Sequence, residues 1–464
     1  MCTLLWCQRD LRINDNAALN WAQLRGQPVI AIYIHSPEED SSWSEGGASR
    51  WWLHNSLDKF SKQLNSIGIA LHFLRGNSVD VIARLISSLP VSAVSWTSRH
   101  EPARRSYEAS IQAMLNKHNI KTYIAQDNII SRPDHFLTAS KQTPYRVFTP
   151  FYNRLRRELE FESCIAPCIE TAAHSKPEYT VPGSLLLAEL NLLDSTGWHH
   201  KLDQYWTAGE TTAHERLNNF IDSTLDTYPV SRDVPAIDGT SMLSPHLAFG
   251  EISPRQVIHA LVPVLDRGKP VSSEAAECFL RQILWREFAR YTLWHFPHTT
   301  DHSMSPKFHQ QFWHKDDELL EAWQRGQTGI AIIDAAMQQL WKTGWMHNRM
   351  RMLVASLLTK NLGIDWRDGA NWFWDTLVDA DLANNTLGWQ WAAGCGVDAA
   401  PYFRIFNPET QAKRYDPDNH YINRWQTPDL KQNVKPVVEL ASSRKAALLR
   451  YKMLAETSQL SHEQ

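Results

Sequence analysis

The chain has 464 residues, of which 43% are hydrophobic, 21% charged and 11% aromatic. This length exceeds what one hydrophobic core usually serves, so two domains are expected. The 47 Lys and Arg residues against 50 Asp and Glu residues give a net charge of −3, which excludes a uniformly basic nucleic-acid-coating protein but allows a local basic patch. No apolar run approaches the roughly 20 residues of a membrane span, and the opening residues carry charge where a signal peptide is apolar. We therefore expect a cytoplasmic protein without membrane contact.

The first 125 residues alternate short apolar runs with amphipathic helical stretches. Five runs are typical of buried strands: Thr3–Cys7, Pro28–Ile34, Ile69–Arg75, Val91–Trp96 and Ile120–Ala125. This alternation predicts an α/β domain with a doubly wound parallel sheet. The turn after the first strand lacks a G-x-G-x-x-G fingerprint, so we do not expect a dinucleotide in this half.

The rest of the chain changes character twice. Residues 131–203 have weak periodicity and many Pro, Ser and Thr residues, which predicts an interdomain connector with little repeating structure. The pattern beyond is almost entirely helical, for example over Ala275–Trp294 and Gly329–Leu362. We expect an α/β domain over 1–130, the connector, and an all-α domain over 204–464.

The numbers of cysteine and tryptophan residues are informative. Six cysteines occur without a C-x-x-C pair, so we expect free thiols and no metal site: Cys2, Cys7, Cys164, Cys168, Cys278 and Cys395. Tryptophan occurs 20 times, against 13 Tyr and 16 Phe, and twelve of the indoles follow residue 280. Core packing explains such an excess as readily as a binding or redox role does.

A hydroxyl-rich segment, DGTSMLSPH, covers residues 238–246. Its pattern predicts Ser244 as a helix N-cap and Pro245 as the first helical residue. Backbone N–H groups and the hydroxyls of Thr240, Ser241 and Ser244 are then placed to hold a phosphate. A capped helix without a ligand explains the same pattern.

Two further segments carry polar groups in helical surroundings. On the helix near residue 280, Phe279, Gln282, Trp285 and Arg286 share one side, which suits a phosphate with a planar base or an ordinary buried face. The segment 344–352, GWMHNRMRM, is expected to place Trp345, Asn348, Arg351 and Met352 on adjoining turns of one helix. His347 is interpreted as a core histidine.

A carboxylate source for Arg351 follows at residues 379–391, DADLANNTLGWQW. A buried arginine needs such a partner, and Asp379 and Asp381 are the candidates. Together these segments offer paired charges, amides and aromatic walls, which a large planar polar cofactor requires.

Six segments resemble the DNA photolyase and cryptochrome family, in family order and over nearly the whole chain: WCQRDLRINDNAAL, DGTSMLSPHLAFGEISPR, LWREF, GWMHNRMRM, DWRDG and DLANNTLGWQWAAGCGVDAAPYFRIFNP. The resemblance implies an amino-terminal antenna domain and a helical domain that binds FAD in a U-shaped form. It assigns the FAD phosphate side to Tyr228, Thr240, Ser241, Met242, Leu243, Ser244, Phe279, Gln282 and Arg286. It assigns the flavin and ribityl side to Trp345, Asn348, Arg351, Asp379, Asp381 and Asn385.

The resemblance also implies roles within that set. Asp379 is expected to pair with Arg351, Asp381 to accept from the flavin imide, and the Asn385 amide to face flavin N5. An amide at N5 serves an anionic reduced flavin without adding a negative charge. With Asn385, the implied catalytic set is a chain of electron carriers to the surface: Trp389, Trp366 and Trp313.

The implied activity is repair of cyclobutane pyrimidine dimers by an electron from photoexcited reduced FAD. A dimer stacks poorly and is extruded from the duplex at lower cost than intact bases. The expected lesion contacts are Gln282, Trp285, Asn348, Arg349, Met352 and Trp391. Arg349, Arg404 and Arg414 are expected to bind phosphates, so affinity for DNA should fall as salt rises.

The chain departs from the family pattern in two places. Gln282 stands where many bacterial dimer photolyases have glutamate, and an amide supplies neither a proton nor an anion. The usual folate contacts are not clearly matched in Ser42–Trp52 or Arg99–Arg105. Methenyltetrahydrofolate is the expected antenna chromophore, with a deazaflavin or an empty antenna site as alternatives.

Three other functions are weighed against dimer repair. A six-four photolyase would need histidines for proton transfer where this chain has Asn348 and Met352. A blue-light receptor shares the fold, but Asn385 and an end at Gln464, soon after the helical pattern Ser442–Ala455, favour repair. A conventional flavin oxidoreductase would need a second cofactor fingerprint. The expected partner is therefore dimer-containing DNA, bound by a monomer.

Overall fold

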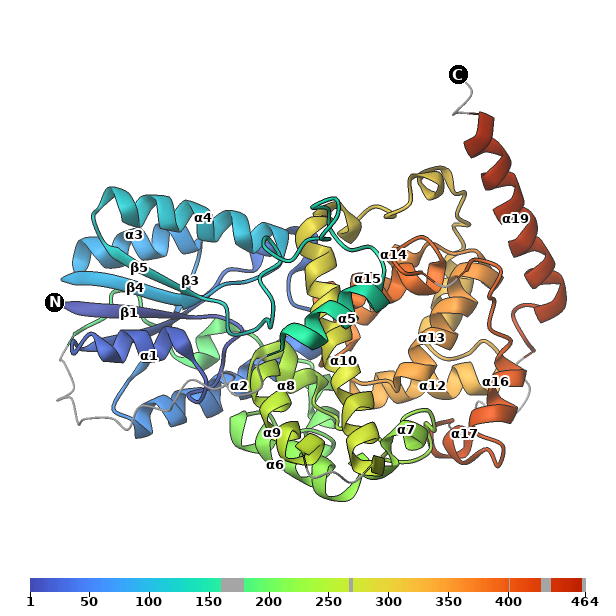
Figure 1. Ribbon diagram of the computed structural model, residues 1–464, viewed down its shortest axis with the longest axis horizontal. Coiled ribbons are helices and arrows are strands. Elements are labelled where there is room, and N and C mark those ends of the chain that lie inside the picture. Colours follow the sequence, from blue (N-terminus) through green and yellow to red (C-terminus); the bar gives the residue numbers. More distant parts are fainter. Residues whose placement is uncertain (160–178, 267–269, 400, 427–434, 461–464) are drawn as a thin grey trace.

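The computed structural model describes residues 1–159, 179–266, 270–399, 401–426 and 435–460. An α/β domain and a larger helical domain lie side by side, and the last helix forms the end of the molecule farthest from the amino terminus (Figure 1). Within the described ranges, no helix is both long enough and apolar enough to cross a membrane.

The α/β domain is built on a five-stranded parallel sheet with the order β3-β2-β1-β4-β5. The strands are β1 (Cys2–Cys7), β2 (Val29–His35), β3 (Leu71–Arg75), β4 (Val91–Thr97) and β5 (Lys121–Ala125). They match the five predicted runs to within two residues at each end, which confirms the doubly wound sheet. Continuous apolar runs form such strands because helices bury both faces of a parallel sheet.

Four helices cover the sheet, two on each face. Leu5 packs in one core with residues of α1 (Ala17–Leu24) and α2 (Gly47–Ser66). Leu4 and Trp6 point the other way, into a core with α3 (Ser78–Ser88) and α4 (Pro102–Lys117). The carboxyl ends of β1 and β4, where the strand order reverses, are buried and point toward the helical domain (Figure 1).

The turn after β1 joins the two domains. Arg12 is fully buried and donates to the carbonyl oxygen of Gly250 at 2.9 Å, and Arg255 donates to the Asp15 carboxylate at 2.7 Å. Gly250 has a φ of 69°, and a Cβ there would lie 1.9 Å from the Arg9 carbonyl oxygen. Only glycine allows this close approach of the two domains.

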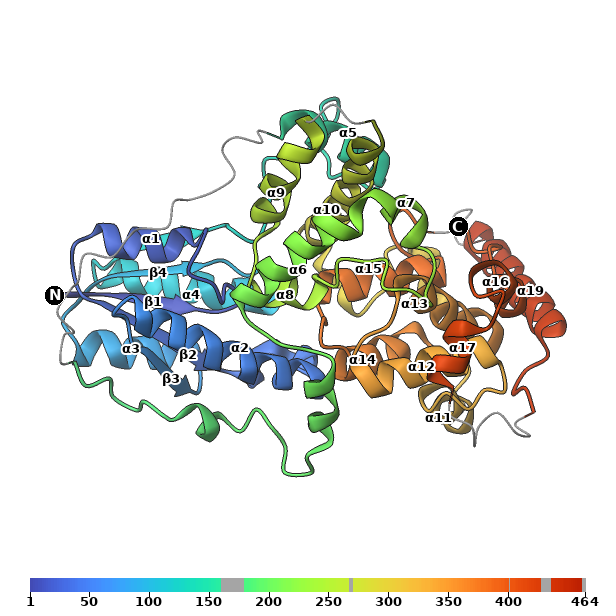
Figure 2. The same cartoon turned by 90° about the horizontal axis from the view of Figure 1, so that it is seen from below.

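The helical domain surrounds α10 (Pro270–His295), the long helix predicted over Ala275–Trp294 (Figures 1 and 2). The other described α-helices are α6 (Glu210–Ser223), α7 (Tyr228–Ser231), α8 (Ser244–Phe249), α9 (Pro254–Asp266), α11 (Asp317–Gln324), α12 (Ala331–Thr343), α13 (Asn348–Ser356), α14 (Trp366–Thr376), α15 (Leu382–Ala393), α16 (Pro408–Tyr415), α17 (His420–Trp425) and α19 (Leu440–Leu460). A π-helix, η8 (Leu357–Leu362), continues α13.

The predicted connector contains a helix that the sequence analysis missed. Helix α5 (Phe148–Glu158) buries Phe148, Phe151 and Leu155, which lie three and four residues apart on one face. These residues belong to a core shared with α10, so α5 packs with the helical domain. Residues 179–203 contain short 3₁₀ turns and one bridge from Leu185 to Phe73 of β3, and they run along the outside of the molecule (Figure 2). Residues 160–178 of the connector lie outside the described ranges.

The predicted helical stretch 329–362 is interrupted. Helix α12 ends at Gly344, which has a φ of 68°, and α13 begins after His347. The buried His347 ring accepts the backbone N–H of Arg349 through Nδ1 at 3.1 Å and so caps α13, which agrees with its interpretation as a core histidine. Trp345 therefore lies in the turn, and its predicted position on the same helix as Asn348 is wrong.

The described cysteines are free. Cys2, Cys7 and Cys395 are buried and Cys278 is half-buried. The other two, Cys164 and Cys168, fall outside the described ranges.

Candidate functional site

The hydroxyl-rich segment folds differently from its prediction. Ser244 is the first residue of α8 and not its N-cap, because Leu243 before it is already helical, with φ −86° and ψ −6°. The Ser244 hydroxyl accepts instead from Nε1 of Trp345 at 3.3 Å. Met242 has a φ of 53°, so the chain turns sharply just before the helix. This hydrogen bond joins two predicted cofactor segments that are 101 residues apart.

Two residues of the predicted phosphate side form a core. Tyr228 and Phe279 are buried and their rings meet edge to face, 5.4 Å apart. Burial raises the pKa of the Tyr228 hydroxyl to about 12, so this group stays neutral. Next to them, Arg232 donates to Oε1 of Gln282 at 3.2 Å. Gln282 Nε2 donates to the Cys278 carbonyl at 3.2 Å, which fixes the orientation of the amide.

Arg286 is a buried cation without a carboxylate. Its guanidinium donates to the backbone carbonyls of Asn128 at 3.3 Å and Leu247 at 3.0 Å, and it forms no ion pair with any residue of the described chain. Burial, reinforced by the positive charge of Arg290, lowers the pKa of Arg286 to about 9. Such a group is costly unless an anion approaches it.

The acidic residues before α15 have two different partners. Asp379 accepts from Arg351 at 2.7 Å, which is the pairing expected from the sequence. Its second oxygen, Oδ1, is buried without a hydrogen bond to any described residue. Asp381 accepts from Arg290 at 2.9 Å and caps α15 by accepting the Asn384 N–H at 2.9 Å. Burial works to raise the pKa of Asp381, but the charges of Arg290 and Arg286 outweigh it and hold the pKa below its ordinary value.

Asn385 lies on α15 beside open space. Its amide nitrogen donates to the Ala370 carbonyl at 3.0 Å, which leaves the amide oxygen and the second N–H available to a ligand. Gly388 follows one turn later, and a Cβ built there meets no atom within 4 Å. The same helix is densely packed at its next residue, Trp389.

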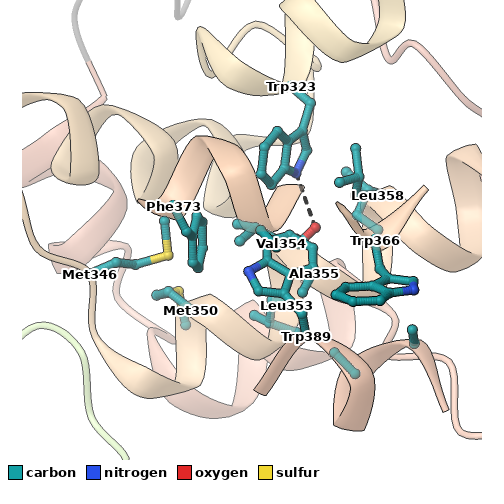
Figure 3. Close-up of a cluster of buried hydrophobic side chains, with 14 of the residues drawn as sticks. Trp323, Met346, Met350, Leu353, Val354, Ala355, Leu358, Trp366, Phe373 and Trp389 are labelled. Carbon is teal, nitrogen blue, oxygen red and sulfur yellow. Dashed lines mark hydrogen bonds between the residues drawn. The ribbon is translucent and has the colours of Figure 1, made fainter. Parts of the chain in front are cut away.

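Trp389 and Trp366 lie in the same buried cluster (Figure 3). They are 2% and 1% exposed, and Gly369 makes room for Trp389: a Cβ on Gly369 would lie 2.1 Å from Cη2 of that indole. Phe373 and Trp323 enclose the indole with ring centroids at 5.0 and 6.0 Å. The predicted outer carrier, Trp313, is half-buried and packs against the same core. The arrangement runs from the deep interior toward the surface.

The aromatic residues predicted to contact a lesion are more accessible. Trp285 is half-buried and stacks on Phe148, with ring centroids 3.7 Å apart and planes 11° apart. Trp391 is also half-buried and lies 6.4 Å from the Phe406 ring. Both indoles therefore keep surface for a ligand.

The polar residues predicted around the lesion are partly engaged. The Asn348 amide donates weakly to the Met352 sulfur at 3.9 Å. Arg349 pairs with Asp233 at 2.6 Å and its guanidinium lies 4.3 Å from the Tyr415 ring centroid. Two other arginines predicted to contact phosphate, Arg404 and Arg414, have exposed side chains.

A cavity of about 150 Å³ lies where the two domains meet. Both segments proposed for the antenna chromophore line it, Ser42 and Trp43 from one and Arg99 from the other. Trp43 meets Trp374 of the helical domain edge to face at 5.5 Å. The cavity thus combines aromatic walls with charged groups.

Known protein families and relatives match this chain over most of its length. Residues 279–446 match the family described as the FAD binding domain of DNA photolyase, and residues 3–173 match the family described as DNA photolyase. A deoxyribodipyrimidine photo-lyase from Agrobacterium fabrum is 40% identical over 430 residues, which cover 92% of this chain and 87% of the relative. The chain belongs to the DNA photolyase and cryptochrome family. The resemblance found in the sequence is confirmed.

Two further relatives show the range of this photolyase and cryptochrome family. The crystal structure of a bacterial class III photolyase from Agrobacterium tumefaciens superposes with a TM-score of 0.90 at 36% identity and covers 98% of both chains. Cryptochrome-1 of Arabidopsis thaliana is 32% identical over 437 residues, which cover 91% of this chain and 62% of the cryptochrome. Both family domains are thus present, and FAD is the cofactor of the helical one.

The residues present fit FAD. Its two phosphates can supply the contact ion pair that the buried Arg286 does not form with the described residues, although the Asp381 charge acts on it from farther away. The unpartnered Asp379 Oδ1 and the amide oxygen of Asn385 are acceptors left for N–H or O–H groups of the cofactor.

Sequence reasoning missed three residues of this site. Arg290, the partner of Asp381, was detectable because it follows Arg286 by four residues on the same helix. Phe148 lies in a segment interpreted as connector, so its contact with Trp285 had no local signal. Trp323 was one of many indoles, and only the fold brings it to Trp389.

Proposed function

We propose that this protein repairs cyclobutane pyrimidine dimers in DNA by light-driven electron transfer from reduced FAD. The observation that carries the proposal is the pair of indoles on α15. Trp389 and Trp391 are two residues apart, about 200° around the helix axis, so one lies in the closed core and the other at the accessible face. Relatives named deoxyribodipyrimidine photo-lyase support the same activity.

When bound, reduced FAD supplies the photoexcited electron that opens the dimer and receives it back afterwards. In the proposed site, Arg286 neutralises the phosphates, with Thr240, Ser241 and Ser244 near them. Arg351 is held in place by Asp379, and the Asn385 oxygen accepts from the flavin edge. Buried Trp366 and Trp389, with Trp313 outside them, replenish electrons from the surface.

The proposed lesion contacts present flat apolar surfaces and few charges. Trp285 and Trp391 stack on the pyrimidines, while Asn348 and Met352 line the side. Gln282 replaces a carboxylate, and Arg232 already occupies its oxygen, so its amide N–H is the group left to share with a pyrimidine carbonyl. Arg349, Arg404 and Arg414 bind phosphates without reading sequence.

A repair assay tests this proposal. The chemically reduced protein should convert a dimer-containing oligonucleotide to intact pyrimidines under blue or near-ultraviolet light and leave it unchanged in darkness. A reduced, illuminated protein that binds the oligonucleotide and leaves the dimer intact would contradict repair and favour the blue-light receptor function of the cryptochrome branch.

We also propose methenyltetrahydrofolate as the antenna chromophore, in the cavity between the domains. The edge-to-face indoles Trp43 and Trp374 offer a wall for a pterin ring. Arg99, which forms an ion pair with Glu101 at 2.8 Å, lines the same cavity and offers polar contacts for the rest of the chromophore. Folate in a solvent extract of the purified protein, lost in Trp43→Ala, would support this assignment. A deazaflavin in the extract would contradict it.

The remaining assignments are proposals of the same kind. The four described free cysteines fit a reducing compartment, which supports a cytoplasmic protein. We propose a monomer, with an antenna domain over 1–130 and a helical domain over 204–464 to which α5 is added. Size-exclusion chromatography with light scattering checks the oligomeric state.

A further inference from the structure

The contact between Phe148 and Trp285 is unusually close for this protein. Their ring centroids are 3.7 Å apart, whereas every other ring pair measured in the described chain is at 4.5 Å or more. The planes are nearly parallel, at 11°. Phe148 is 1% exposed and stacks on one face of the indole, whereas Trp285 remains half-buried and so keeps surface for a ligand.

Helix α5 cannot easily move away from α10. Arg156 donates to both carboxylate oxygens of Glu277, at 2.9 and 3.1 Å, and Tyr152 donates to the same carboxylate. These contacts tie the second half of α5 to the first half of α10, and the two helices lie side by side in Figure 1. The Phe148 ring is therefore held at a fixed position relative to Trp285.

The other end of α5 is tied to the loop after α15. The backbone N–H of Phe148, the first residue of α5, faces the Asp398 carboxylate. Burial raises the pKa of that carboxyl overall, and the Phe148 N–H works to lower it. Asp398 has a φ of 46° and follows Trp391 by seven residues. Phe148 and Asp398 thus connect the helix that stacks on Trp285 with the segment that follows Trp391.

We propose that Phe148 is a positioning residue for lesion recognition, which rests on the proposed function of Trp285. By stacking on the inner face, it holds the indole plane so that the outer face meets the extruded dimer without loss of side-chain freedom on binding. Asp398 keeps this backing in register with the loop that follows Trp391.

Matched variants test the proposal. In Phe148→Leu, the affinity for a dimer-containing oligonucleotide should fall about fivefold, the size of one lost aromatic stack. The affinity for the undamaged oligonucleotide, the FAD content and the rate of FAD photoreduction should not change. Phe151→Leu is the control, because Phe151 is equally buried on α5 but forms no ring contact with Trp285.

Two more variants guard against simple loss of structure. Phe148→Tyr keeps the stacked ring and should bind the dimer within about twofold of wild type. Asp398→Ala should weaken dimer binding by a few-fold, because the carboxylate that faces the Phe148 N–H is lost. Equal dimer affinity in the Phe148→Leu and Phe151→Leu variants, or an equal loss for damaged and undamaged DNA, would overturn the role of Phe148. A wild-type protein that does not distinguish damaged from undamaged DNA would instead overturn the proposed function.

Discussion

The two sides of α15 differ in how far they bury their tryptophan side chains. On the enclosed side, formed by Trp323, Trp366, Trp389 and the π-helix η8, the indoles are almost fully buried (Figure 3). On the open side, which carries Trp285 and Trp391, the indoles remain partly accessible. The role of a tryptophan therefore depends on its surroundings. An enclosed indole is shielded from water, whereas a half-exposed indole offers a surface to a ligand.

A buried cation marks each side. Arg286 on the open side and Lys360 on the enclosed side are 8% and 1% exposed, and both donate to backbone carbonyls. If the open side binds an anionic ligand, replacement of Arg286 should weaken ligand binding. Replacement of Lys360 should change only the stability of the fold.

The largest expected effect follows removal of Arg286. Arg286→Met should weaken FAD binding about 100-fold, because the cofactor's phosphates lose their buried counter-charge. The cofactor-free protein should remain at least as stable, since the cost of burying the charge disappears with it. Fluorescence titration of FAD and thermal unfolding measure the two quantities.

Arg290→Met is the control for this prediction. It strands the Asp381 carboxylate, so the cofactor-free protein itself should lose about 3–5 kcal/mol of stability. Equal losses of FAD affinity and of stability in both variants would show that Arg286 has no special relation to the ligand.

The two glycines near Trp389 separate the packed side from the open side. Gly369→Ala should cost about 3 kcal/mol, because its Cβ would lie 2.1 Å from the Trp389 indole. Gly388→Ala should raise stability by roughly 0.5–1 kcal/mol, since its Cβ meets no atom and alanine favours a helix. Chemical denaturation measures both.

A double variant checks the cause of the Gly369→Ala loss. Phe in Trp389→Phe lacks the outer indole ring, so the cost of Gly369→Ala should fall in that background to what the contact with Leu358 Cδ2 at 2.7 Å leaves. An undiminished cost of Gly369→Ala in the Trp389→Phe background would show that the added Cβ clashes with other atoms.

Burial lowers the pKa of Lys360 from 10.5 to about 8, which corresponds to about 3 kcal/mol. Lys360→Met should therefore be about 2 kcal/mol more stable at pH 7, after loss of the hydrogen bond to the Arg404 carbonyl. Between pH 8 and 10.5 the folded wild type binds fewer protons than the unfolded chain, so its stability rises with pH and the gap narrows. A gap independent of pH in denaturation curves would contradict this.

The smallest effect concerns phosphate binding at Arg349. Arg349→Gln should lower the affinity for damaged and undamaged DNA alike and reduce the slope of log K against log salt by about 1. Stability should change by less than about 0.5 kcal/mol, because the ion pair with Asp233 is partly exposed. Asp233→Asn keeps the cation and should not weaken DNA binding; an equal loss there would assign Arg349 a structural role.

The sequence predicted the features that depend on residues close together in the chain. The five strands, α10 and the Arg351–Asp379 pair follow from apolar runs and from charge pairing, and the structure has all of them. The N-cap at Ser244 and the helical position of Trp345 were wrong, because a turn at Met242 and a left-handed Gly344 decide them. The Phe148–Trp285 stack depends on residues 137 positions apart, which no local pattern contains.

The division of labour between the two sides of α15 is tested by Trp389→Phe in two assays on one preparation. Light-driven reduction of bound oxidised FAD should be nearly abolished, while the chemically reduced variant should repair dimer-containing DNA at close to the wild-type rate. Loss of both activities together, or retention of both, would contradict separate roles for the enclosed and the accessible indoles.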